Sequence, residues 1–155
     1  MVNQIIILSA YEISKFYNPD YKRVLVYSFV TPGFKAPKLS NYLDSICTHR
    51  HIIFAIDSTD KCGNESDSLY IRERYHCFDT DDAILVLESF YRYKEEIDTI
   101  ICQCEAGISR SAGLASALSI ILGIDDSWIY ECKLPNSRIK SLTLNTWITK
   151  FGCRR

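Results

Sequence analysis

The sequence predicts an α/β fold in which a central, mostly parallel β-sheet is flanked by helices. Strand-like runs alternate along the chain with segments of helical apolar periodicity, which is typical of a parallel sheet. The run at residues 99–104 is apolar enough for a strand buried on both faces. With 155 residues, of which 47% are hydrophobic, the chain is large enough for one core. We therefore expect a single domain over residues 1–155.

The predicted strands are runs rich in β-branched and aromatic residues. They lie at residues 4–9, 23–30, 51–58 and 99–104, with a shorter candidate at 74–78. Polar or Pro- and Gly-containing segments separate them, and of these 31–38 and 58–68 are predicted loops.

Three segments are predicted helices. The first begins at Asp81 or Asp82 as its cap and ends in the charged residues 94–96, with apolar residues recurring at Ala83, Leu87 and Phe90. The second, 111–123, is apolar nearly all round, so we expect it to be buried in the centre of the fold. The third begins after Pro135, with Asn136 as its cap.

Composition excludes several classes of partner. Lys and Arg number 18 and Asp and Glu 19, which gives a net charge of -1. A sequence-wide basic field is therefore absent, and we expect neither nucleic acid nor membrane as a partner. The N-terminal apolar run, residues 5–8, is too short for a signal peptide, and no segment reaches the roughly 18 apolar residues of a membrane span. We expect a cytoplasmic protein.

The seven cysteines do not indicate a disulfide scaffold or a metal site. Their number is odd and no export signal accompanies them. No Cys-x2-Cys pair occurs, and the three histidines (His49, His51 and His76) form no helical ligand pair. We therefore expect no metal and no cofactor.

The segment 101–113, ICQCEAGISRSAG, carries the predicted chemistry. A buried strand, a short glycine-containing loop and a helix start follow one another, which makes an anion site of backbone N–H groups. Cys104 stands at its entrance and Arg110 at its far lip. A thiol beside a helix N-terminus and an arginine should have a lowered pKa, and the arginine fork binds two phosphate oxygens at once. This arrangement predicts phosphoryl transfer through a phosphocysteine, with a phosphate-binding loop of Glu105, Ala106, Gly107, Ile108, Ser109 and Arg110.

The same spacing occurs a second time without the same context. Cys132 and Arg138 are also separated by five residues. No apolar strand precedes this copy, it holds no glycine, and its Pro135 lacks an N–H to donate. The surroundings of Cys104, rather than the spacing, therefore carry the prediction.

The stretch CEAGISRSAG resembles the phosphate-binding signature of the cysteine-dependent protein tyrosine phosphatase superfamily, whose loop reads His-Cys-x5-Arg-Ser/Thr. The short chain resembles the compact dual-specificity group. The resemblance implies hydrolysis of phosphotyrosine in phosphorylated proteins, with phosphoserine and phosphothreonine as further candidates. It also implies a loop that binds phosphate, sulfate or vanadate. By the same resemblance, the Ser111 hydroxyl bonds the sulfur and eases breakdown of the phosphocysteine.

The resemblance further implies a general acid, an aspartate on a loop before the cysteine. The segment FDTDD offers three carboxylates, and Asp79, whose Asp-Thr resembles the dual-specificity acid loop, is favoured. Asp81 is the alternative, with Asp82 as a helix cap. A different interpretation is that the whole cluster only caps a helix.

Two departures from the family pattern bear on function. Gln103 stands where the family has histidine, which leads us to expect a less acidic Cys104 thiol. The variable loop positions Glu105, Ile108 and Ser109 include no lysine, which disfavours polyanionic substrates such as phosphoinositides. The alternative functions are a catalytically weak or inactive phosphopeptide-binding module and, more remotely, a sulfur-transferring or arsenate-reducing thiol enzyme.

Overall fold

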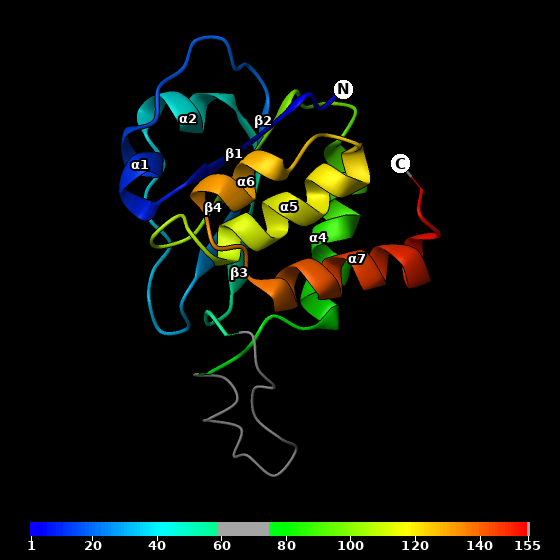
Figure 1. Cartoon of the computed structure of the whole chain (residues 1–155). Coiled ribbons are helices and arrows are strands. Elements are labelled where there is room, and N and C mark those ends of the chain that lie inside the picture. Colours follow the sequence, from blue (N-terminus) through cyan, green and yellow to red (C-terminus); the bar gives the residue numbers. More distant parts are fainter. Residues whose placement is uncertain (59–74, 155) are drawn as a thin grey trace.

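A four-stranded, all-parallel sheet lies at the centre of the fold, as the computed structural model shows for residues 1–58 and 75–154 (Figure 1). Its strands are β1 (Gln4–Leu8), β2 (Val24–Val30), β3 (Cys47–Phe54) and β4 (Thr99–Gln103). The order across the sheet is β1-β4-β2-β3, and every adjacent pair is parallel. Every residue of β2 and β4 is buried, because both central strands are covered on both faces. The predicted α/β class is confirmed.

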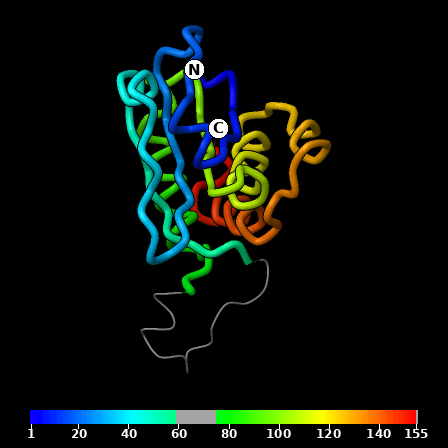
Figure 2. Tube along the Cα trace, turned by 90° about the vertical axis from the view of Figure 1, so that its left-hand side faces the viewer, coloured from blue at the N-terminus to red at the C-terminus, as the bar shows by residue number. Residues whose placement is uncertain are grey.

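Helices cover both faces of the sheet. They are α1 (Ala10–Lys15), α2 (Asn41–Ile46), α4 (Thr80–Tyr93), α5 (Arg110–Leu122), α6 (Ser127–Cys132) and α7 (Ser137–Phe151). Ile13 of α1 and Leu43 of α2 pack with Val24 and Val26 on one face. The opposite face packs against α4, α5 and α7 in the larger core. Figure 2 shows α5, α6 and α7, in yellow to red, on one side of the molecule.

Several element boundaries differ from the sequence prediction. The third strand occupies 47–54 instead of 51–58, because it pairs along all of β2. The short helices α1, α2 and α6 were not predicted, since six residues are too few for a clear amphipathic pattern. Asn136 caps α7 and Gly123 ends α5, as predicted.

The region before α4 also needs correction. Neither Asp81 nor Asp82 caps α4; its N-cap is Asp79, and Asp82 is the third helical residue of a capping box. In place of a strand at 74–78, Cys77 makes an isolated parallel bridge with Ile56. Residue 74 and the predicted loop beyond Ser58 lie outside the described residues.

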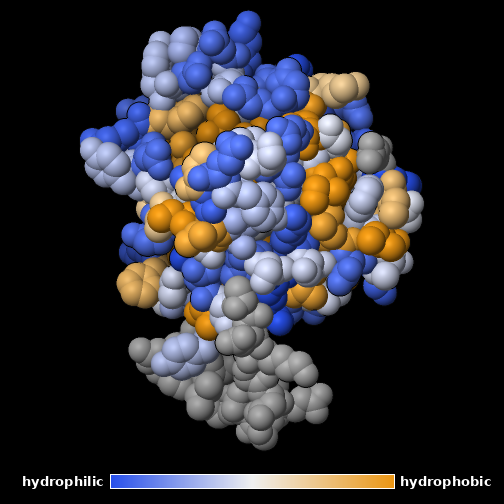
Figure 3. Space-filling view, in the orientation of Figure 1, coloured by the Kyte–Doolittle hydropathy of each residue, from blue (hydrophilic) through white to orange (hydrophobic). Residues whose placement is uncertain are grey.

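The surface is mixed in character. On the face seen in Figure 3, hydrophobic residues occur in separate groups between hydrophilic ones. Among the residues that the structure describes, no helix has both the length and the apolarity that crossing a bilayer requires.

Candidate active site

The predicted loop from Cys104 to Ser109 lies between β4 and α5, at the carboxyl end of the sheet. In a parallel sheet the carboxyl ends of all strands meet at one edge, which is where ligand sites gather. The residues that follow β1, β2 and β3 therefore surround the loop that follows β4. The site is assembled from these four connections, together with the segment between α6 and α7.

The first half of the loop rests on the connection between β1 and α1. Cys104 N donates to Leu8 O (3.3 Å), and Ala10 N donates to Glu105 O (3.0 Å). Gly107 has a φ of 67°, and a Cβ there would lie 2.7 Å from Ser9 N. Only glycine fits at this position, because both the backbone conformation and the close approach exclude a side chain.

The second half of the loop is held by the segment before α7. Leu134 N donates to Ile108 O (3.1 Å), and Asn136 N donates to Ser109 O (3.0 Å). A Cβ on Gly113 would lie 2.5 Å from Asn136 O, so this glycine lets α5 approach that segment closely. Backbone contacts on both sides thus fix the loop's shape.

The Cys104 thiol is buried and surrounded by donors. Ser111 Oγ lies 3.1 Å from its Sγ. Burial raises the pKa of Cys104, but hydrogen bonds from the Ser111 hydroxyl and from the N–H groups of Ser111, Ile108 and Gly107 outweigh it, so that the pKa lies below its ordinary value. The side chain of Gln103, which precedes Cys104, is buried, and among the described residues its Oε1 has no hydrogen-bond partner.

The Arg110 guanidinium is held at the other end of the loop. Arg110 is 6% exposed, and its Nη1 donates to Ala55 O (2.8 Å) and to Thr31 Oγ1 (3.1 Å). Both acceptors follow neighbouring strands, β3 and β2. Because only Nη1 is used in these bonds, the other guanidinium nitrogens remain for an anion.

A pocket of about 350 Å³ opens over the loop. Cys104 and Arg110 line it, as do two exposed apolar residues, Ile108 and Leu134. Asp57, which comes shortly after β3, also lines it. The pocket therefore combines a thiol of lowered pKa, a guanidinium, a helix N-terminus and one aspartate.

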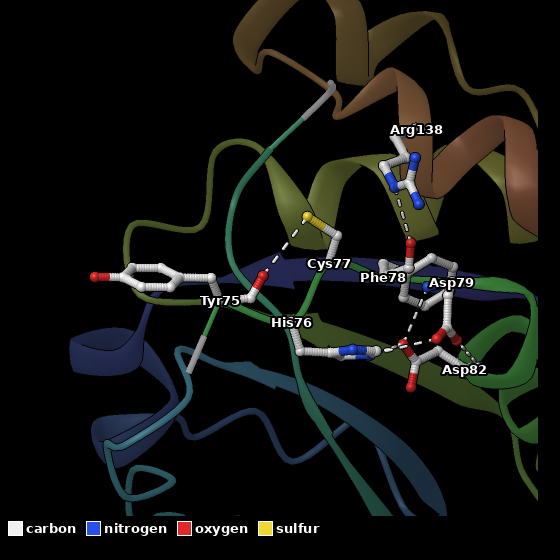
Figure 4. Close-up of polar contacts among 7 residues, drawn as sticks. All are labelled: Tyr75, His76, Cys77, Phe78, Asp79, Asp82 and Arg138. Atoms are coloured by element: carbon white, nitrogen blue, oxygen red, sulfur yellow. Dashed lines mark hydrogen bonds and ion pairs between the residues drawn. The ribbon is translucent and has the colours of Figure 1, made fainter. Parts of the chain in front are cut away.

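The favoured acid, Asp79, occupies a different place. Its Oδ1 accepts from Asp82 N (2.9 Å), and Asp82 Oδ2 accepts from Asp79 N (3.1 Å), the two reciprocal bonds of a capping box. Asp79 does not line the pocket that holds Cys104. Figure 4 shows its carboxylate turned, with that of Asp82, toward His76.

His76, Asp79 and Asp82 form the one group of possible metal ligands among the described residues, with ligand atoms within 4.8 Å of one another. His76 Nε2 lies 2.7 Å from Asp82 Oδ2 and 3.8 Å from Asp79 Oδ2. These contacts and the capping box account for the cluster without an ion. It does not line the pocket of Cys104.

The sequence prediction missed four groups that line the pocket or hold the residues lining it. They are the Asp57 carboxylate, the Asn136 side-chain amide, and the two groups that hold Arg110, Thr31 Oγ1 and Ala55 O. One signal could have found Asp57 and Thr31. Each follows a parallel strand at the edge where the nucleophile's strand also ends.

Comparison with known proteins bears on the fold. No protein-family model matches the sequence, and no curated protein matches it. PTPMT1, in a crystal structure in complex with PI(5)P, is similar with a TM-score of 0.55 and 9% identity over 92% of this chain and 89% of that one. Human DUSP28 is similar with a TM-score of 0.53 and 10% identity over 97% and 95%. The chain therefore has the fold of the compact, dual-specificity type of cysteine-dependent phosphatase.

Proposed function

We propose that the protein hydrolyses phosphate monoesters, with phosphotyrosine in proteins as the substrate and phosphoserine or phosphothreonine as further candidates. One observation carries the proposal: the Cys104 sulfur lies within a ring of donors, with the Ser111 hydroxyl at 3.1 Å and three backbone N–H groups around it. A thiolate held in this way is a ready nucleophile, and the same N–H groups suit phosphate oxygens.

The reaction has two steps. The Cys104 thiolate attacks phosphorus, and the bond to the leaving oxygen breaks as that oxygen takes a proton from an acid. Water then attacks the phosphocysteine, the sulfur–phosphorus bond breaks, and inorganic phosphate leaves. The backbone N–H groups of 105–110 and the Arg110 guanidinium hold the three equatorial oxygens. The Ser111 hydroxyl stabilises the thiolate as it leaves.

Pocket chemistry favours a single phosphate on an aromatic group. Ile108 and Leu134 present exposed apolar side chains at the rim, where an aryl ring would lie. Arg110 is the one cationic residue among the described residues that line the pocket, and Asp57 and Glu105 add negative charge. The PI(5)P in the PTPMT1 crystal structure raises phosphoinositides as a second class, but this charge pattern favours a phosphoprotein. A reducing compartment such as the cytoplasm would keep the thiol active.

Hydrolysis of para-nitrophenyl phosphate in the presence of EDTA tests the proposal. We expect turnover that vanadate inhibits and that Cys104→Ser abolishes, with Cys132→Ser as the matched control. Acid quenching should trap a phosphocysteine on the starting protein. Full activity in Cys104→Ser would refute the mechanism, and phosphotyrosine-peptide binding without turnover would instead show the inactive binding module.

A further inference from the structure

Asp57 is the one aspartate among the described residues that line the pocket of Cys104, where Glu105 is the other carboxylate. It lines the same cavity as Cys104 and Arg110, and its side chain is exposed to solvent and hence to substrate. Asp57 follows β3 at the carboxyl edge of the sheet, where the connections after all four strands surround the site. Asp79, in contrast, has one oxygen in a helix cap and does not line the cavity.

Two donors bond the same carboxylate oxygen of Asp57. Ser109 Oγ donates to Oδ1 at 2.7 Å, and Asn136 Nδ2 donates to the same Oδ1 at 2.9 Å. Among the described residues, Oδ2 accepts no hydrogen bond. An oxygen that already accepts two hydrogen bonds is a poor place for a proton, so a proton on this carboxyl group belongs on Oδ2.

Neither of the two donor groups, Ser109 Oγ and Asn136 Nδ2, makes a helix-capping bond. Ser109 is the N-cap residue of α5, yet its hydroxyl makes no capping bond and reaches Asp57 instead. The Ser109 side chain therefore does not occupy an N–H group at the start of α5. Asn136 caps α7 through its Oδ1 while its amide nitrogen also donates to Ser58 O (3.2 Å). One asparagine thus ties the segment 57–58 to the start of α7.

From this geometry we infer that Asp57 is the general acid, and that Ser109 and Asn136 are positioning residues that fix its Oδ1 so that Oδ2 carries the proton. The inference rests on the proposed hydrolysis. In the first step Oδ2–H gives its proton to the leaving oxygen as the phosphorus–oxygen bond breaks. In the second step the Asp57 carboxylate takes a proton from the attacking water, which returns the acid to its starting form.

Leaving-group dependence gives the decisive test. Phenyl phosphate needs a proton on its leaving oxygen, whereas a polyfluorinated phenyl phosphate leaves readily as the anion. We expect Asp57→Asn to lose about 10²–10⁴-fold in kcat/KM, which reports the first step, on phenyl phosphate, and far less on the fluorinated ester. The pH profile of kcat/KM should also lose its fall toward alkaline pH. Asp125→Asn, at an exposed aspartate that follows the C-terminal end of α5, is the matched control.

The positioning residues have their own readouts. Ser109→Ala should lower kcat on phenyl phosphate with KM unchanged, and Ser109→Thr, which keeps the hydroxyl, should restore it. Asn136→Asp keeps the oxygen that caps α7 but replaces the donor to Asp57 with a second carboxylate, so the alkaline fall of the activity should shift in pH.

The outcomes separate the two proposals. Loss of all activity in Cys104→Ser with an unchanged leaving-group dependence in Asp57→Asn would overturn this inference alone. A steep leaving-group dependence appearing in Asp79→Asn and not in Asp57→Asn would assign the acid to Asp79. Full activity in Cys104→Ser would overturn the proposed hydrolysis and, with it, the role given to Asp57.

Discussion

One hydroxyl group, that of Ser111, contributes much to the lowered pKa of the Cys104 thiol. Burial alone would hold the thiol protonated, as it does for Cys102 on the same strand, whose pKa burial raises far above its ordinary value. Cys104 differs because the Ser111 hydroxyl and the loop N–H groups stabilise its thiolate. The pKa values of two cysteines that are two residues apart are therefore shifted in opposite directions.

Removal of that hydroxyl should raise the pKa of Cys104. In Ser111→Ala the rate of alkylation by iodoacetamide should reach its midpoint at a higher pH than in the starting protein, because burial is then opposed by backbone donors only. The rate in mildly acidic buffer should fall. Ser116→Ala, which removes a buried hydroxyl from the same helix, is the control. Superimposable pH profiles for Ser111→Ala and the starting protein would contradict the role of Ser111.

At the scale of elements, the site depends on how closely two helices approach. Gly113 of α5 lies against the backbone of Asn136 at the start of α7, and Asn136 in turn holds both the catalytic loop and Asp57. The packing of α5 against α7 therefore also positions the loop from Cys104 to Ser109. A change in that packing should alter the geometry of the site.

A methyl group on Gly113 should therefore destabilise the protein. Gly→Ala within a helix ordinarily adds about 1 kcal/mol of stability. Here the Cβ would lie 2.5 Å from Asn136 O, a backbone atom, and overpacking of this kind costs about 1–3 kcal/mol. We expect a lower free energy of unfolding in urea and weaker phosphate binding. Ser119→Ala, a buried position on α5 whose Oγ has no partner among the described residues, should change little.

The capping role of Asp79 leads to a prediction for α4. Asp79→Ala removes the side chain that accepts from Asp82 N, so the free energy of unfolding should fall by about 1 kcal/mol. Asp81→Ala removes an equal charge from the exposed first turn without breaking the cap, and its effect should be smaller. Equal losses in the two variants, measured by urea unfolding, would show that charge rather than capping matters.

At the scale of the whole molecule, the sheet decides where the chemistry can occur. The sequence was sufficient to predict the α/β class, the strands β1, β2 and β4, the helix α5 and the loop with Cys104, Arg110 and Ser111. Long apolar runs and a glycine-containing turn are local signals. The hydrogen bonds from Ser109 and Asn136 to Asp57 are not local: they join residues far apart in the chain, so no spacing reveals them. The Asp79 pattern is ambiguous because a helix cap and an acid loop use the same residue type, and the structure shows Asp79 as the N-cap of α4.

The pH dependence of stability is also a property of the whole fold. Burial, with a smaller contribution from His49, lowers the pKa of His51 below its ordinary 6.5. In the range between the two values the unfolded chain binds more protons than the folded one, so stability falls as the pH drops through 6.5. His51→Gln should flatten this part of the profile, measured by urea unfolding at several pH values. Parallel profiles for the two proteins would contradict it.

The loop from Cys104 to Ser109 is held by the segment before α7, and this affects the order in which the site is assembled during synthesis. The bonds from Arg110 to Thr31 and from Asn136 to Asp57 each close a separation of 79 residues. A chain made from its N-terminus has the nucleophile in place well before Asn136 follows, and contacts between distant residues form late in folding. In the nascent protein Cys104 is therefore present before Asn136 can hold Asp57, and the site that we propose is assembled only when α7 has docked.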